Sequence, residues 1–170
     1  MPKACPYHDD PPVLLSKKTL ADWDVASPVA FSCSPVNNLI IMIINNELLD
    51  NVTTKAEESP RLRMNYNLHE SLDAKAQRLV NVLLPGTILP IHRHRHTAET
   101  YILLRGKLIV VFYDETGAQT ERHLIDPATG NYGVHIPKNQ WHTVEVIEPS
   151  AIFEVKDGPY TPLTPEDTME

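Results

Sequence analysis

From residue 61 onwards the chain is a series of short strand-like segments separated by turns, and this pattern constrains the fold most. In "RLRMNYNLH" (61–69) polar residues alternate with Leu62, Met64, Tyr66 and Leu68, the period of a half-buried strand. Similar runs occupy 77–84, 87–94, 100–106, 107–113, 120–125, 133–137, 141–147 and 151–156. About eight short strands without intervening helices predict a mainly β fold, an antiparallel sandwich or barrel.

One helix is predicted before the strands, between Asn45 and about Ser59. This stretch contains no proline or glycine, Asn46 is the expected N-cap, and Pro60 ends the run. Its apolar residues recur at helical spacing and are Leu48, Leu49, Val52 and Ala56. A second, short helical turn is expected near Glu70–Lys75.

The length of 170 residues suits one ordinary domain. Residues 1–41 carry six of the fifteen prolines and show no sustained periodicity, so we expect an N-terminal extension or edge strands there. The β-barrel domain is expected over 42–160. A proline-broken, acidic C-terminal tail over 161–170 is expected to pack loosely outside it.

The composition predicts a soluble globular protein without a transmembrane or targeting segment. A formal net charge of -7 argues against nucleic acid as a partner. The two cysteines, Cys5 and Cys33, form no metal-binding or disulfide pattern, which fits a reducing cytoplasm.

The segment "HRHRH" (92–96) places histidines at alternate positions, so His92 and His94 face one way on a strand, and His96 joins them if the strand continues. Imidazole is a common transition-metal ligand, and Glu99 on the next strand is placed to add a carboxylate. The alternative is a polar edge strand with solvated histidines. A register slip to the pair His94 and His96 also stays open.

Two motifs resemble those of the cupin superfamily. The first runs from Gly86 through His92-x-His94 and Glu99 to Gly106. The second is "PKNQWH" (137–142), in which Asn139 takes the place of the usual glycine; asparagine tolerates the same left-handed turn.

This resemblance implies a cupin double-stranded β-helix, a jelly-roll barrel, that holds one divalent transition metal, Zn, Fe, Mn or Ni. The implied ligands are His92, His94, Glu99 and His142. Segments including "SPRLRMNYNLH", "QRLVNVLLPGT" and "GVHIPKNQWHT" further resemble the WbuC family of cupin fold metalloproteins over about 45–160. That resemblance implies a role near surface-polysaccharide (O-antigen) metabolism. The resemblance to cupins, which often dimerise through sheet edges, implies a homodimer.

Other polar side chains are candidates for binding a substrate. If one face of the 61–69 segment lines the barrel, it offers donors for carboxylate, phosphate or sugar hydroxyls. These substrate-binding candidates are Arg61, Arg63, Asn65, Asn67 and, extending the same logic, Gln77, Arg78 and Asn81. Tyr101 shares a face with Glu99 and is a candidate proton donor if its pKa is lowered, although core packing is the alternative. Packing is expected for Trp141, and ordinary strand positions for His123 and His135.

Two functions remain open on the sequence. The first is a metal-dependent enzyme, an isomerase, epimerase or dioxygenase of the cupin type, acting on a small polar, carbohydrate-related or anionic molecule. The second is a non-catalytic module that binds or senses a sugar through its metal. A redox-active metal with open positions would favour the enzyme, and a closed zinc site would favour the binding module.

Overall fold

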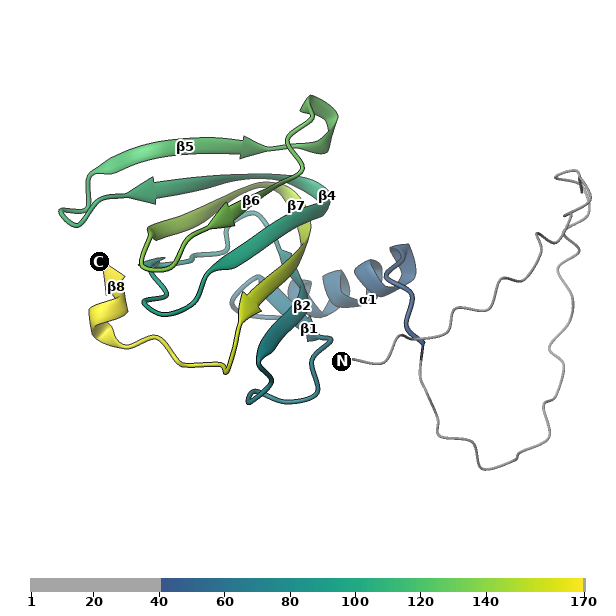
Figure 1. Cartoon of the computed structure of the whole chain (residues 1–170). Helices are drawn as coiled ribbons and strands as arrows, with labels where there is room; N and C mark the ends of the chain where they lie inside the picture. Colours follow the sequence, from purple (N-terminus) through teal and green to yellow (C-terminus); the bar gives the residue numbers. More distant parts are fainter. Residues whose placement is uncertain (1–40, 170) are drawn as a thin grey trace, which may run out of the picture. The chain divides into compact units, whose positions relative to one another are not determined.

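The computed structural model describes residues 41–169, and the predicted N-terminal extension lies outside this range except for Ile41. One helix precedes a mixture of short and long strands (Figure 1). The elements are α1 (Asn46–Glu57), β1 (Arg63–Asn67), β2 (Ala76–Leu83), β3 (Ile91–His92), β4 (Glu99–Tyr113), β5 (Gln119–Ile125), β6 (Gly133–Ile136), β7 (Trp141–Asp157) and β8 (Thr168–Met169), with 3-10 turns at Pro127–Thr129 and Pro165–Asp167. The predicted mainly β architecture with one helix at its start is confirmed.

Helix α1 is capped one residue earlier than the sequence suggested. Asn45, and not Asn46, is the N-cap, and its side chain accepts a hydrogen bond of 3.0 Å from the Leu48 amide. The buried side of the helix contains Leu49, Val52 and Ala56. The helical turn expected near residues 70–75 is wrong: this segment forms bends and turns between β1 and β2.

The strands pair antiparallel in one sheet. Its main path runs β1-β2-β7-β3-β8, and β4 pairs with β7 and also with β5 and β6. The predicted segments 100–106 and 107–113 form the single strand β4, and 141–147 and 151–156 join in β7, because the chain continues through local bulges instead of turning. Among the described strands the sheet does not close into a barrel.

Gly106 explains how β4 continues through its bulge. Its φ is +91°, in the left-handed region that residues with a side chain rarely adopt. A Cβ at this position would collide with the Pro149 backbone oxygen on β7. The register of β4 against β7 shifts across this residue, between Arg105 and Lys107, and again on either side, between Leu103 and Arg105 and between Lys107 and Leu108. Gly106, the last residue of the first motif, therefore permits close contact between the two longest strands, β4 and β7.

Apolar side chains cover both faces of the sheet. On one face, α1 packs on β1 and β2 (Figure 1). That cluster includes Val80, Val82 and Ala151 together with the buried residues of the helix. On the other face, a second cluster surrounds Leu83, Leu108, Ile136 and Ile152. The candidate site lies on this second face. Because side chains alternate between the two faces along each strand, this face is opposite the one that the helix covers.

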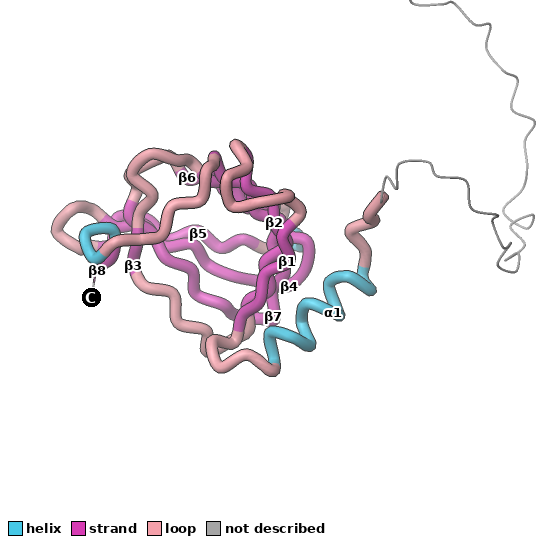
Figure 2. Tube along the Cα trace, turned by 90° about the horizontal axis from the view of Figure 1, so that it is seen from below, coloured by secondary structure: helices cyan, strands magenta, loops and turns pink. Residues whose placement is uncertain are grey.

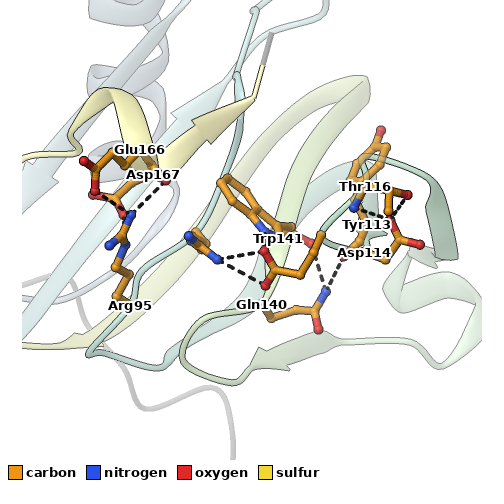
Figure 3. A network of polar contacts seen from close by, with 10 residues as sticks. Arg95, Tyr113, Asp114, Thr116, Gln140, Trp141, Glu166 and Asp167 are labelled. Carbon is orange, nitrogen blue, oxygen red and sulfur yellow. Dashed lines mark hydrogen bonds and ion pairs between the residues drawn. The ribbon is translucent and has the colours of Figure 1, made fainter.

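The C-terminal tail is tied to the sheet, contrary to the expected loose packing. Strand β8 pairs with β3, and the two lie side by side in Figure 2. Arg95 holds the turn before β8 through Asp167, at 2.6 Å, and Glu166, at 3.1 Å (Figure 3). The Arg93 amide also donates to the Asp167 carbonyl at 3.1 Å.

The described residues contain no helix long and apolar enough to cross a membrane.

Candidate metal centre

Three strands bring His92, Glu99 and His142 together. His92 ends β3, Glu99 begins β4 and His142 lies at the start of β7. His92 and His142 are direct register partners, and their ring centroids are 4.3 Å apart. One ligand atom from each of the three residues lies within 4.8 Å of the others, so the group could hold a metal ion.

Two atoms of this group are buried without a hydrogen bond. His142 Nε2 lies 2.7 Å from Glu99 Oε1, yet neither atom has a hydrogen-bond partner of acceptable geometry. The His142 and Glu99 side chains are only 1% and 2% exposed. Since a buried unsatisfied polar atom is costly, two such atoms directed at one point fit a bound cation.

Backbone carbonyls fix the orientation of both imidazoles. His92 Nδ1 lies 3.0 Å from the Pro90 carbonyl, and His142 Nδ1 lies 2.9 Å from the Gln140 carbonyl. A carbonyl only accepts, so each Nδ1 carries the proton and each Nε2 keeps a free lone pair. Such contacts to the remote ring nitrogen are usual for metal-binding histidines.

The turn before His142 depends on Asn139. Its φ is +67°, so asparagine supplies the left-handed conformation expected for this position of the second motif. The Asn139 amide donates to the His94 carbonyl at 2.7 Å. This bond connects the turn that carries His142 to the segment that carries the other two histidines.

His94 lies beside the group but interacts with a lysine. Its Nε2 is 3.6 Å from Glu99 Oε2 and 3.2 Å from Lys156 Nζ. Because an ammonium group only donates, the His94 lone pair accepts this contact. Lys156 is the register partner of Glu99 on β7, and its Nζ is also 3.6 Å from Glu99 Oε2.

The protonation states suit a metal site. Burial, followed by the neighbouring His142, lowers the pKa of His92 to about 4. Burial likewise lowers the pKa of His94 to about 4, against the opposing charge of Glu99. Burial alone would raise the pKa of Glu99, but positive charge beside the carboxylate, from His142 when its Nε2 is protonated and from Lys156, outweighs it, and the pKa falls. Neutral imidazoles and an ionised carboxylate are the forms that bind a metal.

Two further ionisable groups lie on the same face, Glu154 and Tyr101. Burial and the charge of Glu99 raise the pKa of Glu154, whose Oε2 accepts a 3.3 Å hydrogen bond from Asn81. Burial and both carboxylates raise the pKa of Tyr101 well above its ordinary value. A lowered pKa was the condition for Tyr101 as a proton donor, so the structure favours its packing role in the core.

A cavity of about 290 Å³ opens beside the histidines. Its polar lining includes Arg63, Asn81, His92, His94, Glu99, Tyr101, Glu154 and Lys156. A neighbouring cavity of about 350 Å³ is lined by Asn65, Asn67 and Gln77, and it shares Glu154, Lys156 and Tyr160 with the first. The face of β1 that carries Arg63, Asn65 and Asn67 therefore lines these cavities.

Arg61 and Arg78 do not share this position. Both side chains are exposed and line neither cavity, because Arg61 precedes β1 and Arg78 lies on the alternate face of β2 from Asn81. Arg63 lines the cavity and also donates to the Ile88 carbonyl at 2.7 Å, which anchors its guanidinium.

The strand expected over "HRHRH" ends at His92, because only Ile91 and His92 form β3 and residues 93–98 are loop, so strict alternation does not extend past His92. Arg93 lies over the Trp141 ring, 4.3 Å from its centroid, and Trp141 Nε1 donates to Glu115 at 3.1 Å. Figure 3 shows Trp141 beside Gln140 and, separately, Arg95 with Glu166 and Asp167. His96 is exposed. His123 and His135 are also exposed, on β5 and β6.

Sequence reasoning missed Lys156 and Glu154. Both belong to the segment "AIFEVK", where Ile152, Glu154 and Lys156 alternate toward one face, and this spacing was the available signal. Two charged residues on the buried side of a predicted strand are unusual and point to a site.

Comparison with known proteins adds a family model and several solved structures. A model described as a domain of unknown function, DUF6016, matches residues 44–125. No curated protein matches the chain. Similar solved structures include TT1209 from Thermus thermophilus, at 20% identity, 58% coverage of this chain, 86% of that chain and a TM-score of 0.47.

Two other similar structures have the same low level of identity. KdgF from Halomonas sp. has 14% identity, a TM-score of 0.48 and coverage of 61% of this chain and 84% of that chain. A cupin 2 domain-containing protein from Halorhodospira halophila has 17% identity, a TM-score of 0.45 and coverage of 56% and 63%. At such identities, these names describe those proteins only. The described part of this chain is an antiparallel β protein with a histidine–glutamate group that could hold a metal.

Proposed function

We propose that this protein binds one divalent transition metal through His92, Glu99 and His142, with His94 as the fourth ligand. The observation that carries the proposal is the pair of buried, unpartnered atoms, Glu99 Oε1 and His142 Nε2. Tautomers that leave Nε2 free on His92 and His142 support it. His94 would join the set by exchanging its contact with Lys156 for the metal.

The metal is proposed to hold a small polar ligand. A cavity beside the ligand group leaves room for a coordination position that the protein does not fill, as in catalytic metal sites and unlike closed structural ones. When bound, the metal would act as a Lewis acid on a carbonyl or hydroxyl of that ligand. Asn81 and Arg63 line the same cavity and would orient it.

The resemblance to the WbuC family supports a carbohydrate-related ligand linked to surface-polysaccharide metabolism. An isomerase, epimerase or dioxygenase reaction is the corresponding enzymatic activity. Non-catalytic sugar binding is the second function, favoured by the raised pKa of Tyr101, which argues against the proton donor that the sequence suggested.

A cytoplasmic homodimer is part of the same proposal. Strand β5 pairs only with β4 among the described strands, and its residues 119–124 are exposed. An exposed strand edge of this kind is commonly covered by another chain. The cysteine usage fits a reducing compartment.

Elemental analysis of protein purified without added metal tests the metal site. We expect close to one transition-metal ion per chain in the wild type, and its loss in Glu99→Gln and His142→Ala. His123→Ala, which alters an exposed histidine on β5, is the matched control and should keep the metal. Unchanged metal content in both site variants would refute the assignment.

A further inference from the structure

Lys156 carries a largely buried ammonium group that the proposed metal ligation does not use. Its side chain is 15% exposed, and its Nζ is 3.2 Å from His94 Nε2, 3.6 Å from Glu99 Oε2 and 3.8 Å from Glu154 Oε1. Close charge-assisted bonds to carboxylate are about 2.7–2.9 Å long. Lys156 is therefore held between several acceptors without a short ion pair to either carboxylate.

Lys156 also lies where the cavities of this face meet. Together with Tyr160, it lines the cavity beside the histidines, the amide-lined cavity and a third cavity, of about 290 Å³, under the C-terminal tail. Lys156 is therefore within reach of a ligand in any of these three cavities. Its position thus suits recognition of a ligand as well as support of the fold.

The charge balance of the buried face changes when a cation binds. Glu99 and Lys156 carry opposite charges, and Glu154 is the other carboxyl group within 4 Å of Nζ. A divalent ion on Glu99 would add two positive charges beside the ammonium group. Even with Glu154 ionised, positive charge would then exceed negative charge in a poorly solvated cavity, where uncompensated charge is costly.

We infer that Lys156 binds the oxyanion of a small acidic ligand that also reaches the metal, so that the ligand of this site is an acid and not a neutral sugar. The inference rests on the proposed metal-binding function and adds the chemical class of the ligand. A carboxylate and a phosphate share this chemistry, since lysine recognises either as a point charge.

The neighbouring amide groups suit the rest of such a ligand. Asn81 lines the histidine cavity, and Asn65 and Asn67 line the next one. Asn65 Nδ2 donates to Asn67 Oδ1 at 2.6 Å, which leaves a second donor on Asn65 and the amino group of Asn67 available for hydroxyls. An acid that carries hydroxyl groups would use both kinds of contact.

Calorimetric titration of the metal-loaded full chain tests the inference with three probes: glycolate, inorganic phosphate and uncharged ethylene glycol. We expect glycolate or phosphate to bind, and ethylene glycol to bind far more weakly. In Lys156→Met the affinity for the binding anion should fall about 10-fold or more, as expected for the loss of a charged hydrogen bond. Lys156→Arg should retain most of it.

Lys138→Met is the matched control, because Lys138 is exposed in the turn before His142. It should bind the anion like the wild type. Metal content and the thermal unfolding transition are measured for every variant, which separates loss of anion binding from loss of metal or fold. Binding of glycolate alone identifies a carboxylate ligand, and binding of phosphate alone identifies a phosphate.

Two results would overturn the inference while the metal site stands. One is unchanged anion affinity in metal-loaded Lys156→Met; the other is that metal-loaded wild-type protein binds neither anion. Absence of metal from the wild type after loading is a different result. It refutes the proposed function, and the charge argument with it, and elemental analysis distinguishes it from the first two.

Discussion

His142 Nε2 lies 2.7 Å from Glu99 Oε1, and both atoms are buried without a hydrogen bond. The His142 Nδ1 proton reaches the Gln140 carbonyl, and the other Glu99 oxygen lies 3.6 Å from both Lys156 Nζ and His94 Nε2. Both residues thus direct a buried, unpartnered atom to the same place. A cation there would satisfy both lone pairs at once.

His94→Ala and His96→Ala distinguish the two histidine pairs that the sequence allows. His94 lies 3.6 Å from Glu99, whereas His96 is exposed. We expect His94→Ala to weaken metal binding by at least about 10-fold, because even loss of a group that only supports a metal ligand has that effect. Competition with a chromogenic chelator measures the affinity. Loss of metal in His96→Ala with retention in His94→Ala would reverse the choice.

Gly106→Ala should destabilise the protein more than Gly130→Ala. Both residues have a left-handed φ, which costs a residue with a side chain about 1–2 kcal/mol. No atom lies within 4 Å of a Cβ at Gly130, whereas one at Gly106 meets the Pro149 backbone. We expect a total loss of about 3 kcal/mol or more for Gly106→Ala, once overpacking is included. The free energies of unfolding in urea provide the comparison, and equal losses would contradict the packing argument.

Asn139 offers a test of the turn that carries His142. Its φ of +67° should make Asn139→Gly neutral or slightly stabilising, while Asn139→Ala should cost about 1 kcal/mol in the free energy of unfolding. The hydrogen bond from its amide to the His94 carbonyl is available to either variant. Urea denaturation of the two proteins checks the difference, and a more stable alanine variant would show that backbone strain is not what selects asparagine here.

The local parts of the site could be predicted from the sequence. Alternation predicts that His92 and Arg93 point to different sides, because this relation depends on neighbouring residues alone. Glu99 and His142 were indicated as ligands by the resemblance of two short motifs to those of cupins. Lys156 could not be placed in this way. Its contact with Glu99 depends on the register of β4 against β7, which pairs residues 57 positions apart and exists only in the folded sheet.

Errors in the predicted elements have physical causes of the same kind. The break expected between residues 106 and 107 is a bulge, because close approach of Pro149 holds Gly106 in the sheet. The N-cap is Asn45 and not Asn46 because either asparagine side chain can accept an amide of the first turn, and the backbone, extended at Asn45 and helical from Asn46, decides between them. The tail was expected to be loose because its pairing with β3 and Arg95 is long-range.

Acid should release the C-terminal tail through Asp167. Hydrogen bonds from Thr164, and the hydrogen bond and charge of Arg95, hold the pKa of Asp167 below its ordinary value of 3.8. A carboxyl whose pKa is lower in the folded state stabilises that state above its unfolded pKa, and this contribution is lost as the pH falls through the folded pKa. Amide hydrogen exchange at Arg93, which donates to the Asp167 carbonyl, reports the contact. We expect protection at neutral pH and its loss below about pH 4, whereas Asp167→Asn should show weakened protection at both. Equal protection in the variant and the wild type at neutral pH would mean that the strand pairing of β8 holds the tail without this ion pair.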